Sequence, residues 1–193
     1  MTAETKRSVW LALGQVALVV LSVGLGLAVG EWRQSRADAA RAAQAVDGAV
    51  REIARNQRRA ADAIIYHDEL FEALESGETQ SVQLRPAFLV DNAWETAQAA
   101  GVVPDLPYPV VEALAAIHDT QTTYQRLAEL NIGLLYFGNI YSGAALPSDA
   151  KGYASSVSDL RLFERELVAQ YGAALAAIDA AGFAVADSLL AAP

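Results

Sequence analysis

An uncharged run of 22 residues, from Val9 to Gly30, constrains this chain more than any other feature of its sequence. The run reads VWLALGQVALVVLSVGLGLAVG, and Gln15 is its only strongly polar side chain. A helix rises about 1.5 Å per residue, so the run is about 33 Å long and can cross a hydrocarbon layer of about 30 Å. We therefore predict a transmembrane helix over residues 9–30, preceded by a short tail at residues 1–8.

The residues at both ends of this run favour a boundary between membrane and water. Trp10 and Trp32 lie near its two ends, where indole rings prefer the headgroup layer. Basic side chains flank the run on both sides: Lys6 and Arg7 before it, and Arg33, Arg36 and Arg41 after it. We expect Trp10, Trp32, Arg33 and Arg36 to lie at the membrane interface, with the lipid bilayer as a partner.

A cleaved signal peptide and a buried helix are the alternatives to an uncleaved anchor. The apolar core of a signal peptide is about 7–15 residues long and ends in a site with small residues. Here the core is longer, and Glu31-Trp32-Arg33 follows inside an apparent helix. An uncleaved anchor is therefore the preferred interpretation.

The charges of the chain are unevenly placed. Residues 31–60 carry seven arginines against four acidic side chains, whereas residues 61–193 carry five basic against 18 acidic ones. Such an acidic distal part repels nucleic acid, so we expect no nucleic-acid partner. The absence of cysteine excludes disulfides, thiolate metal sites and thiol nucleophiles. Basic residues are balanced across the apolar run, but a short leading tail commonly stays cytoplasmic, which favours an extracytoplasmic, periplasmic domain.

The spacing of apolar residues predicts that residues 31–193 form a helical bundle domain. Apolar positions alternate by three and four, as in a coiled-coil seam, and no strand-like alternation of useful length occurs. The predicted helices span about residues 31–76, 91–100, 109–141 and 149–190. Gly77 and Gly101 are expected to end the first two, Asp91-Asn92 to cap the second, and the prolines of 104–109 to form a rigid extended turn. The predicted fold is all-α: one N-terminal transmembrane helix, then an antiparallel bundle of three long helices and one short helix.

Polar residues interrupt the predicted seams at five positions: Gln57, His67, Gln121, Asn131 and Glu164. Buried polar groups at such positions can fix the register between helices. They could instead line a ligand pocket or be exposed. The residues three before His67 and His118 are not glutamates, so the Glu-x-x-His pattern of a bundle metal site is missing and we predict no metal site.

Two further patterns, small residues in the apolar run and arginines further along the chain, could each mediate binding or have only a structural role. Ser22, Gly26 and Gly30 are spaced four apart, which lets membrane helices approach closely, although glycine is also simply frequent in such helices. Arg51, Arg55, Arg58 and Arg59 form a basic stripe that is either a solvated face or a contact with lipid phosphate or an acidic partner.

Two passages resemble a bacterial group of small single-span inner-membrane proteins of unknown function. The first is the apolar span ending in GEWRQSR and followed by a charged helix; the second is AWETAQAAGVVPDLPYPVVEAL, a Trp-Glu-Thr helix followed by glycine, a proline turn and another helix. The chain departs from the common pattern with Gly30-Glu31 before Trp32. The resemblance implies this architecture and a bacterial inner-membrane setting, and because the function of the group is unknown it transfers no activity. It marks Trp94, Glu95 and Thr96 as a structural wedge or a contact surface.

These patterns favour an accessory, scaffold or assembly protein that holds a membrane-protein partner or forms a homo-oligomer. The motifs of nucleophilic, zinc-dependent and nucleotide-dependent enzymes are missing, so we expect neither catalysis nor a cofactor. The alternative is a membrane-tethered ligand-sensing bundle that signals through a partner, with a pocket near His67, Gln121 and Tyr124. A concave polar cavity above about 300 Å³ would favour ligand binding, and filled seams would favour scaffolding.

Overall fold

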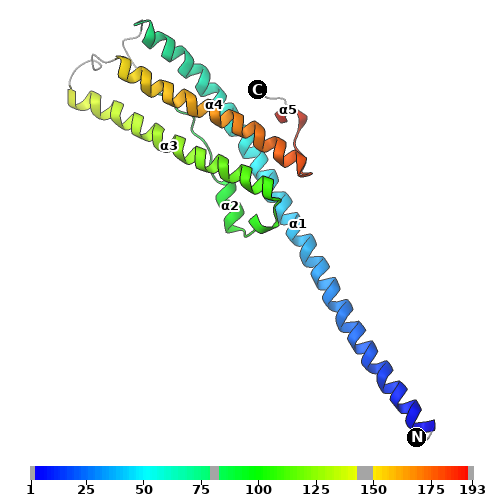
Figure 1. Ribbon diagram of the computed structural model, residues 1–193. Helices are drawn as coiled ribbons and strands as arrows, with labels where there is room; N and C mark the ends of the chain where they lie inside the picture. The colour runs from blue at the N-terminus through cyan, green and yellow to red at the C-terminus, as the bar shows by residue number, and fades with distance from the viewer. Residues whose placement is uncertain (1–2, 79–82, 143–149, 191–193) are drawn as a thin grey trace. The chain divides into compact units, whose positions relative to one another are not determined.

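The computed structural model describes residues 3–78, 83–142 and 150–190, with side chains throughout except at 3–14, 16–17, 134–142 and 150–152 (Figure 1). These residues form six helical segments: α1 (Ala3–Glu75), α2 (Ala93–Ala99), the 3₁₀ helix η1 (Val103–Asp105), α3 (Tyr108–Ser142), α4 (Ala150–Ala180) and α5 (Asp187–Leu190). No strand occurs in this described part, so the all-α prediction is confirmed.

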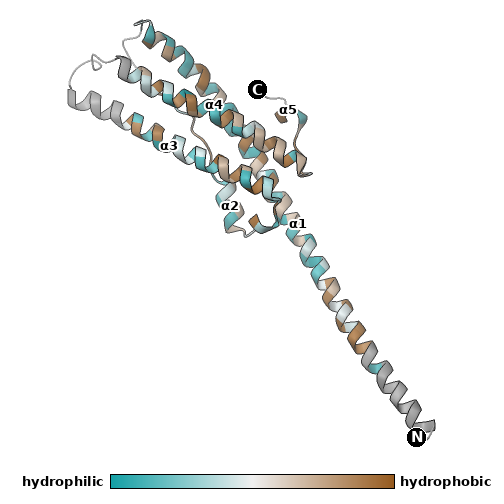
Figure 2. Ribbon diagram, in the orientation of Figure 1, coloured by the Kyte–Doolittle hydropathy of each residue, from teal (hydrophilic) through white to brown (hydrophobic). Residues whose placement is uncertain are grey.

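The chain divides into two compact units, residues 1–41 and 42–193. The first consists of the leading part of α1, in which Figure 2 shows apolar (brown) stretches as well as hydrophilic (teal) residues. Within the described residues, no helix is long and apolar enough to cross a membrane. The predicted span over 9–30 includes residues 9–14 and 16–17, whose side chains lie outside the described set.

In the second unit, α3 and α4 pack against each other in opposite directions. Tyr124 of α3 bonds to Glu164 of α4, and the earlier Gln121 bonds to the later Tyr171. The connection between the two helices, residues 143–149, lies outside the described residues.

The last part of α1 also packs against α4 in the opposite direction. Leu74, at the end of α1, shares an apolar cluster with Ala154 at the start of α4, whereas the earlier His67 bonds to the later Glu164. Helices α1 and α3 therefore run the same way, so the predicted antiparallel arrangement holds for α4 against α1 and against α3 but is wrong for α1 and α3. The reason is that the chain between them first returns along α1 before α3 begins.

The predicted seams form the core of this unit. All five polar seam residues are buried, together with apolar residues from α1, α3 and α4 such as Val46, Val110 and Leu160. The buried face of α1 begins at Ala42. Leu130 of α3 is 65% exposed.

Glycines with positive φ end three of the helices. Gly77 and Gly101 follow α1 and α2 with φ of 73° and 67°, as predicted. The last helix was predicted to reach residue 190 but ends at Ala180, because Gly182 adopts φ 88° and Phe183 N–H donates to the Ile178 carbonyl, which closes the helix end. The proline-rich stretch predicted as an extended turn contains η1 instead.

Candidate functional site

A buried chain of hydrogen bonds joins α1, α3 and α4 through three side chains, which we call the buried triad: His67, Tyr124 and Glu164. The Tyr124 hydroxyl donates to Glu164 Oε1 at 2.7 Å and accepts from the backbone N–H of Ala87 at 2.7 Å. Glu164 Oε2 lies 2.9 Å from His67 Nδ1. All three side chains are 0% exposed, so two of the five positions that interrupted the seams, His67 and Glu164, meet in the core.

The chemistry of the buried triad is that of a closed structural network. Burial raises the pKa of the Tyr124 phenol, and the neighbouring Glu164 carboxylate raises it further, so Tyr124 stays a neutral donor. Gln121 donates to the buried Tyr171 hydroxyl at 2.8 Å nearby. His67 Nε2 has no hydrogen-bond partner among the described residues. Solvent does not reach these three side chains.

Residues 83–92, which we call the return segment, have no regular secondary structure and run antiparallel to α1. Side chains of α1 bond to its backbone in order. Tyr66 OH donates to the Gln83 carbonyl at 2.5 Å, and Arg59 Nη1 donates to the Phe88 carbonyl at 2.6 Å. Asn56 Nδ2 donates to the Val90 carbonyl at 2.6 Å. These side chains satisfy backbone groups that would otherwise need a sheet partner.

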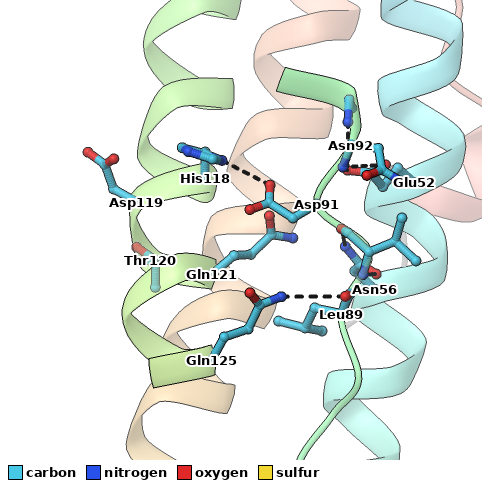
Figure 3. Close-up of polar contacts among 12 residues, drawn as sticks. Glu52, Asn56, Leu89, Asp91, Asn92, His118, Asp119, Thr120, Gln121 and Gln125 are labelled. Carbon is cyan, nitrogen blue, oxygen red and sulfur yellow. Dashed lines mark hydrogen bonds and ion pairs between the residues drawn. The ribbon is translucent and has the colours of Figure 1, made fainter. Parts of the chain in front are cut away.

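Helix α3 holds the return segment from the other side, as Figure 3 shows. His118 Nδ1 lies 2.9 Å from Asp91 Oδ1, and Gln125 Nε2 donates to the Leu89 carbonyl at 3.5 Å. The return segment is therefore tied to two of the three long helices.

Helix α2 is capped from α1 rather than by its own sequence. Asn92 makes no side-chain cap bond, which corrects the predicted Asp91-Asn92 cap. Glu52 Oε1 instead accepts from the backbone N–H groups of Asn92 at 3.3 Å and Ala93 at 3.1 Å. Burial raises the pKa of Glu52, while these two N–H groups lower it.

A cleft of about 450 Å³ lies between α1 and the return segment. Its lining comes from one face of α1 and from the start of the return segment: Arg59, Asp62, Ala63, Tyr66, Arg85, Pro86, Ala87 and Phe88. We call it the arginine cleft. Among the clefts lined by described residues it is the one that combines size, charge and an aromatic surface, as an external ligand would need.

The described residues form no ligand-sized pocket near His67, Gln121 and Tyr124, where one was expected. His67 and Tyr124 are 0% exposed, and Gln121 is 2% exposed. The cavity that Tyr124 helps to line measures about 170 Å³, and the one lined by Gln121 about 10 Å³, room for a single water. Both fall below the size expected of a ligand site, so the large cleft lies elsewhere than predicted.

The two histidines lie in separate environments, His67 with Glu164 and His118 with Asp91. Among the described residues no group of three or more potential metal ligands comes together. In the basic stripe, Arg51 pairs with Asp47 at 2.5 Å and Arg58 donates to the Ala54 carbonyl of its own helix, whereas Arg59 reaches the return segment.

The residues marked by the resemblance lie on α2. Trp94 is partly buried and packs against the main apolar core, while Glu95 and Thr96 are exposed. Trp94 thus has the position of a wedge, and its two neighbours remain candidates for a contact surface.

The predicted membrane residues lie in the first unit. The Ser22 hydroxyl donates to the Leu18 carbonyl at 2.7 Å, and a Cβ at Gly26 or Gly30 would meet no atom within 4 Å. Trp32 and Arg33 are exposed, and the Arg36 guanidinium lies 5.0 Å from the Trp32 ring centroid. Trp10 lies outside the residues whose side chains are described.

Sequence reasoning missed the anchoring roles of Glu52, Asn56 and Tyr66. A signal was present, because residues 52, 56, 59, 63 and 66 alternate by four and three and so share one face of α1. This polar face lies beside the apolar seam. Comparison with protein-family models, with curated proteins and with solved structures found no match.

Proposed function

We propose that this chain is a membrane-anchored helical-bundle protein that acts as a non-catalytic accessory, scaffold or assembly subunit. The closed interior of the second unit supports this proposal. Two of the polar seam residues, His67 and Glu164, bond to each other in the core, Tyr124 also bonds to Glu164, and all three are sealed from solvent. A filled bundle of this kind presents a fixed outer surface to a partner.

The exposed apolar face of the first unit supports a membrane anchor. The eight large apolar side chains between Leu18 and Val29 are each 47–68% exposed. Burying apolar surface is worth about 25 cal/mol per Å², so a bilayer would stabilise this stretch far better than water. In the proposed arrangement residues 9–30 span a bacterial inner membrane, Trp32 and Arg36 lie at the headgroups, and the bundle is periplasmic.

The proposed partner is a second copy or another membrane protein. The face of Ser22, Gly26 and Gly30 is open in the single chain, which suits close packing against a neighbouring membrane helix. Exposed Glu95 and Thr96 on α2 offer a second contact surface. The ligand-sensing alternative is favoured by one observation, the arginine cleft.

Carbonate extraction and protease protection of native membranes test the anchor. A spanning helix keeps the full-length protein in the membrane pellet, and a periplasmic bundle is digested only when the outer face is accessible. Release of the protein by carbonate would contradict the anchor.

Affinity purification of the tagged full-length chain in mild detergent, followed by mass spectrometry, tests the scaffold role. A stoichiometric membrane complex that the Glu95→Ala/Thr96→Ala variant disrupts would support an accessory subunit with this contact surface. Glu69→Ala, which changes an exposed residue of α1, is the matched control. Recovery of the protein alone would count against a stable scaffold complex.

A further inference from the structure

We propose that the arginine cleft binds an organic monoanion, a carboxylate attached to an apolar or aromatic body. This inference does not depend on the proposed scaffold function, because it rests only on the lining of one cleft. Its volume of about 450 Å³ lies within the range of about 300–1,000 Å³ that is usual for small-molecule sites.

Two guanidinium groups supply the anion-binding side of the cleft. Neither Arg59 nor Arg85 forms an ion pair with a carboxylate of the described residues. The planar fork of arginine matches a carboxylate and can donate two hydrogen bonds to it. Both side chains are exposed, so their remaining N–H groups are accessible to a ligand.

Both guanidinium groups are held in place by neighbours in the same cleft. Arg59 Nη1 donates to the Phe88 carbonyl at 2.6 Å. Arg85 lies over the Tyr66 ring, 4.8 Å from its centroid, and Tyr66 OH is itself bonded to Gln83. Such positioning reduces the loss of side-chain freedom when a ligand binds, which favours affinity.

The apolar side of the cleft suits the body of the ligand. Phe88 is 80% exposed at the rim, an unusual position for a phenylalanine next to a buried proline and a buried alanine. The floor is rigid, because Ala87 N–H bonds to Tyr124 of the buried triad. A flat apolar group can therefore lie against Phe88 while its carboxylate meets the arginines.

Asp62 also lines the cleft and sets the charge of the ligand. Two arginines and one aspartate leave a net charge of one positive unit, which a single carboxylate neutralises. A phosphate dianion would leave one uncompensated negative charge beside Asp62 in the occupied cleft. The charge of the lining therefore matches a monoanion.

The test is a ¹⁹F NMR titration of the purified full-length protein in detergent with 4-fluorophenylacetate. The neutral 4-fluorophenylacetamide and the dianionic 4-fluorophenyl phosphate are the comparison ligands. We expect saturable binding of the carboxylate only, or at least about tenfold tighter binding than either comparison ligand. The amide lacks the charge-assisted hydrogen bond, and the phosphate leaves an uncompensated negative charge beside Asp62.

Substitutions in the cleft and beside it show whether the ligand binds there. Arg85→Gln, which changes an exposed residue without a bond to the backbone of another segment, should weaken binding by at least about tenfold. Arg59→Gln should act likewise, provided circular dichroism shows an unchanged fold. Arg58→Gln is the matched control, because Arg58 lies next to Arg59 but does not line the cleft.

The expected pattern is loss of binding in Arg85→Gln and unchanged binding in Arg58→Gln. The proposal would be overturned if the amide bound as tightly as the carboxylate or if the phosphate bound more tightly. Equal effects of Arg85→Gln and Arg58→Gln would also overturn it. So would the absence of saturable binding up to about 10 mM, because a dissociation constant above that is too weak for a formed site.

Discussion

The amide of Asn56 bonds both backbone polar groups of Val90: Nδ2 donates to the carbonyl at 2.6 Å, and Oδ1 accepts from the N–H at 3.0 Å. The side chain thus takes the place of a neighbouring strand for one residue of the return segment. Asn56 is 0% exposed, so neither Val90 group has water as a substitute partner on that side. This contact fixes where the return segment lies along α1.

Replacing Asn56 by alanine should lower the free energy of unfolding by about 2–4 kcal/mol, because two backbone groups of Val90 lose their partners in a buried place. Urea unfolding followed by circular dichroism measures the change. Asn56→Asp keeps the acceptor and loses the donor, so its effect should be intermediate. Gln44→Ala, at an exposed position of α1, is the control and should stay within about 0.5 kcal/mol.

Removing the carboxylate of the buried triad should have one of the largest effects in the bundle. Glu164→Ala leaves His67 and Tyr124 without their shared acceptor and should lower stability by about 3–5 kcal/mol, whereas Glu164→Gln should lower it less. A double-mutant cycle with His67→Ala should give a coupling energy of about 1–3 kcal/mol. Additive effects of the two substitutions would contradict a direct contact.

The pH dependence of stability should reveal the buried Glu52. Burial raises the folded pKa of Glu52 above its ordinary value of 4.5. Its contribution to stability is therefore fully present below pH 4.5 and is lost as the pH rises through the folded pKa. Glu52→Gln keeps an acceptor for Asn92 and Ala93 but cannot ionise, so its stability relative to the unsubstituted chain should rise as the pH increases from 4 toward 7.

Urea midpoints measured at several pH values check this trend. Glu69→Gln, which changes an exposed carboxylate on the same helix, is the control. If the trend comes from Glu52 at the start of α2, the Glu69 variant should not show it. A constant difference between Glu52→Gln and the unsubstituted chain would contradict it.

Substitutions at Trp94, Glu95 and Thr96 should distinguish a side chain that packs in the core from side chains that form a contact surface. Truncating a fully buried tryptophan costs about 3–5 kcal/mol, and Trp94 is partly buried, so Trp94→Ala should lower stability by about 2 kcal/mol. Glu95→Ala and Thr96→Ala should change it by less than about 0.5 kcal/mol. Thermal unfolding measures all three, and a neutral Trp94→Ala would contradict the wedge.

The small-residue face of the first unit should control self-association. Gly26→Ile combined with Gly30→Ile adds side chains where the single chain has open space, so the monomer is not strained but a close helix pair would be. We expect a homo-oligomer to dissociate, as measured by cross-linking in membranes. Val20→Ile with Leu27→Ile, at exposed positions away from this face, should leave it intact. An unchanged oligomer in the glycine variant would remove this face from the proposed assembly.

The sequence predicted which residues form the interior of the bundle. The alternation by three and four identified Val110, Ile117 and Leu160 as core residues, and it included the polar positions His67 and Glu164 in the same seams. Periodicity is a local property of a helix, so it can be read without knowing the partners.

The sequence could not place the end of the last helix or the arginine cleft. Gly182 fits the seam spacing equally well as a helical residue or as a left-handed stop, and only the surrounding packing chooses between them. The cleft depends on Arg59 and Arg85, which are 26 positions apart and meet only because the chain folds back.

By itself, the sequence determined the helical class, the buried stripes and the apolar run at the N-terminal end, because each is set by side chains within a few turns of one another. The tertiary structure decided that α1 and α3 run the same way and that Glu52 caps α2. It also decided that His67, Tyr124 and Glu164 share one buried contact. These features join residues far apart in the chain, and the return segment, whose backbone needs partners from other elements, is what brings them together.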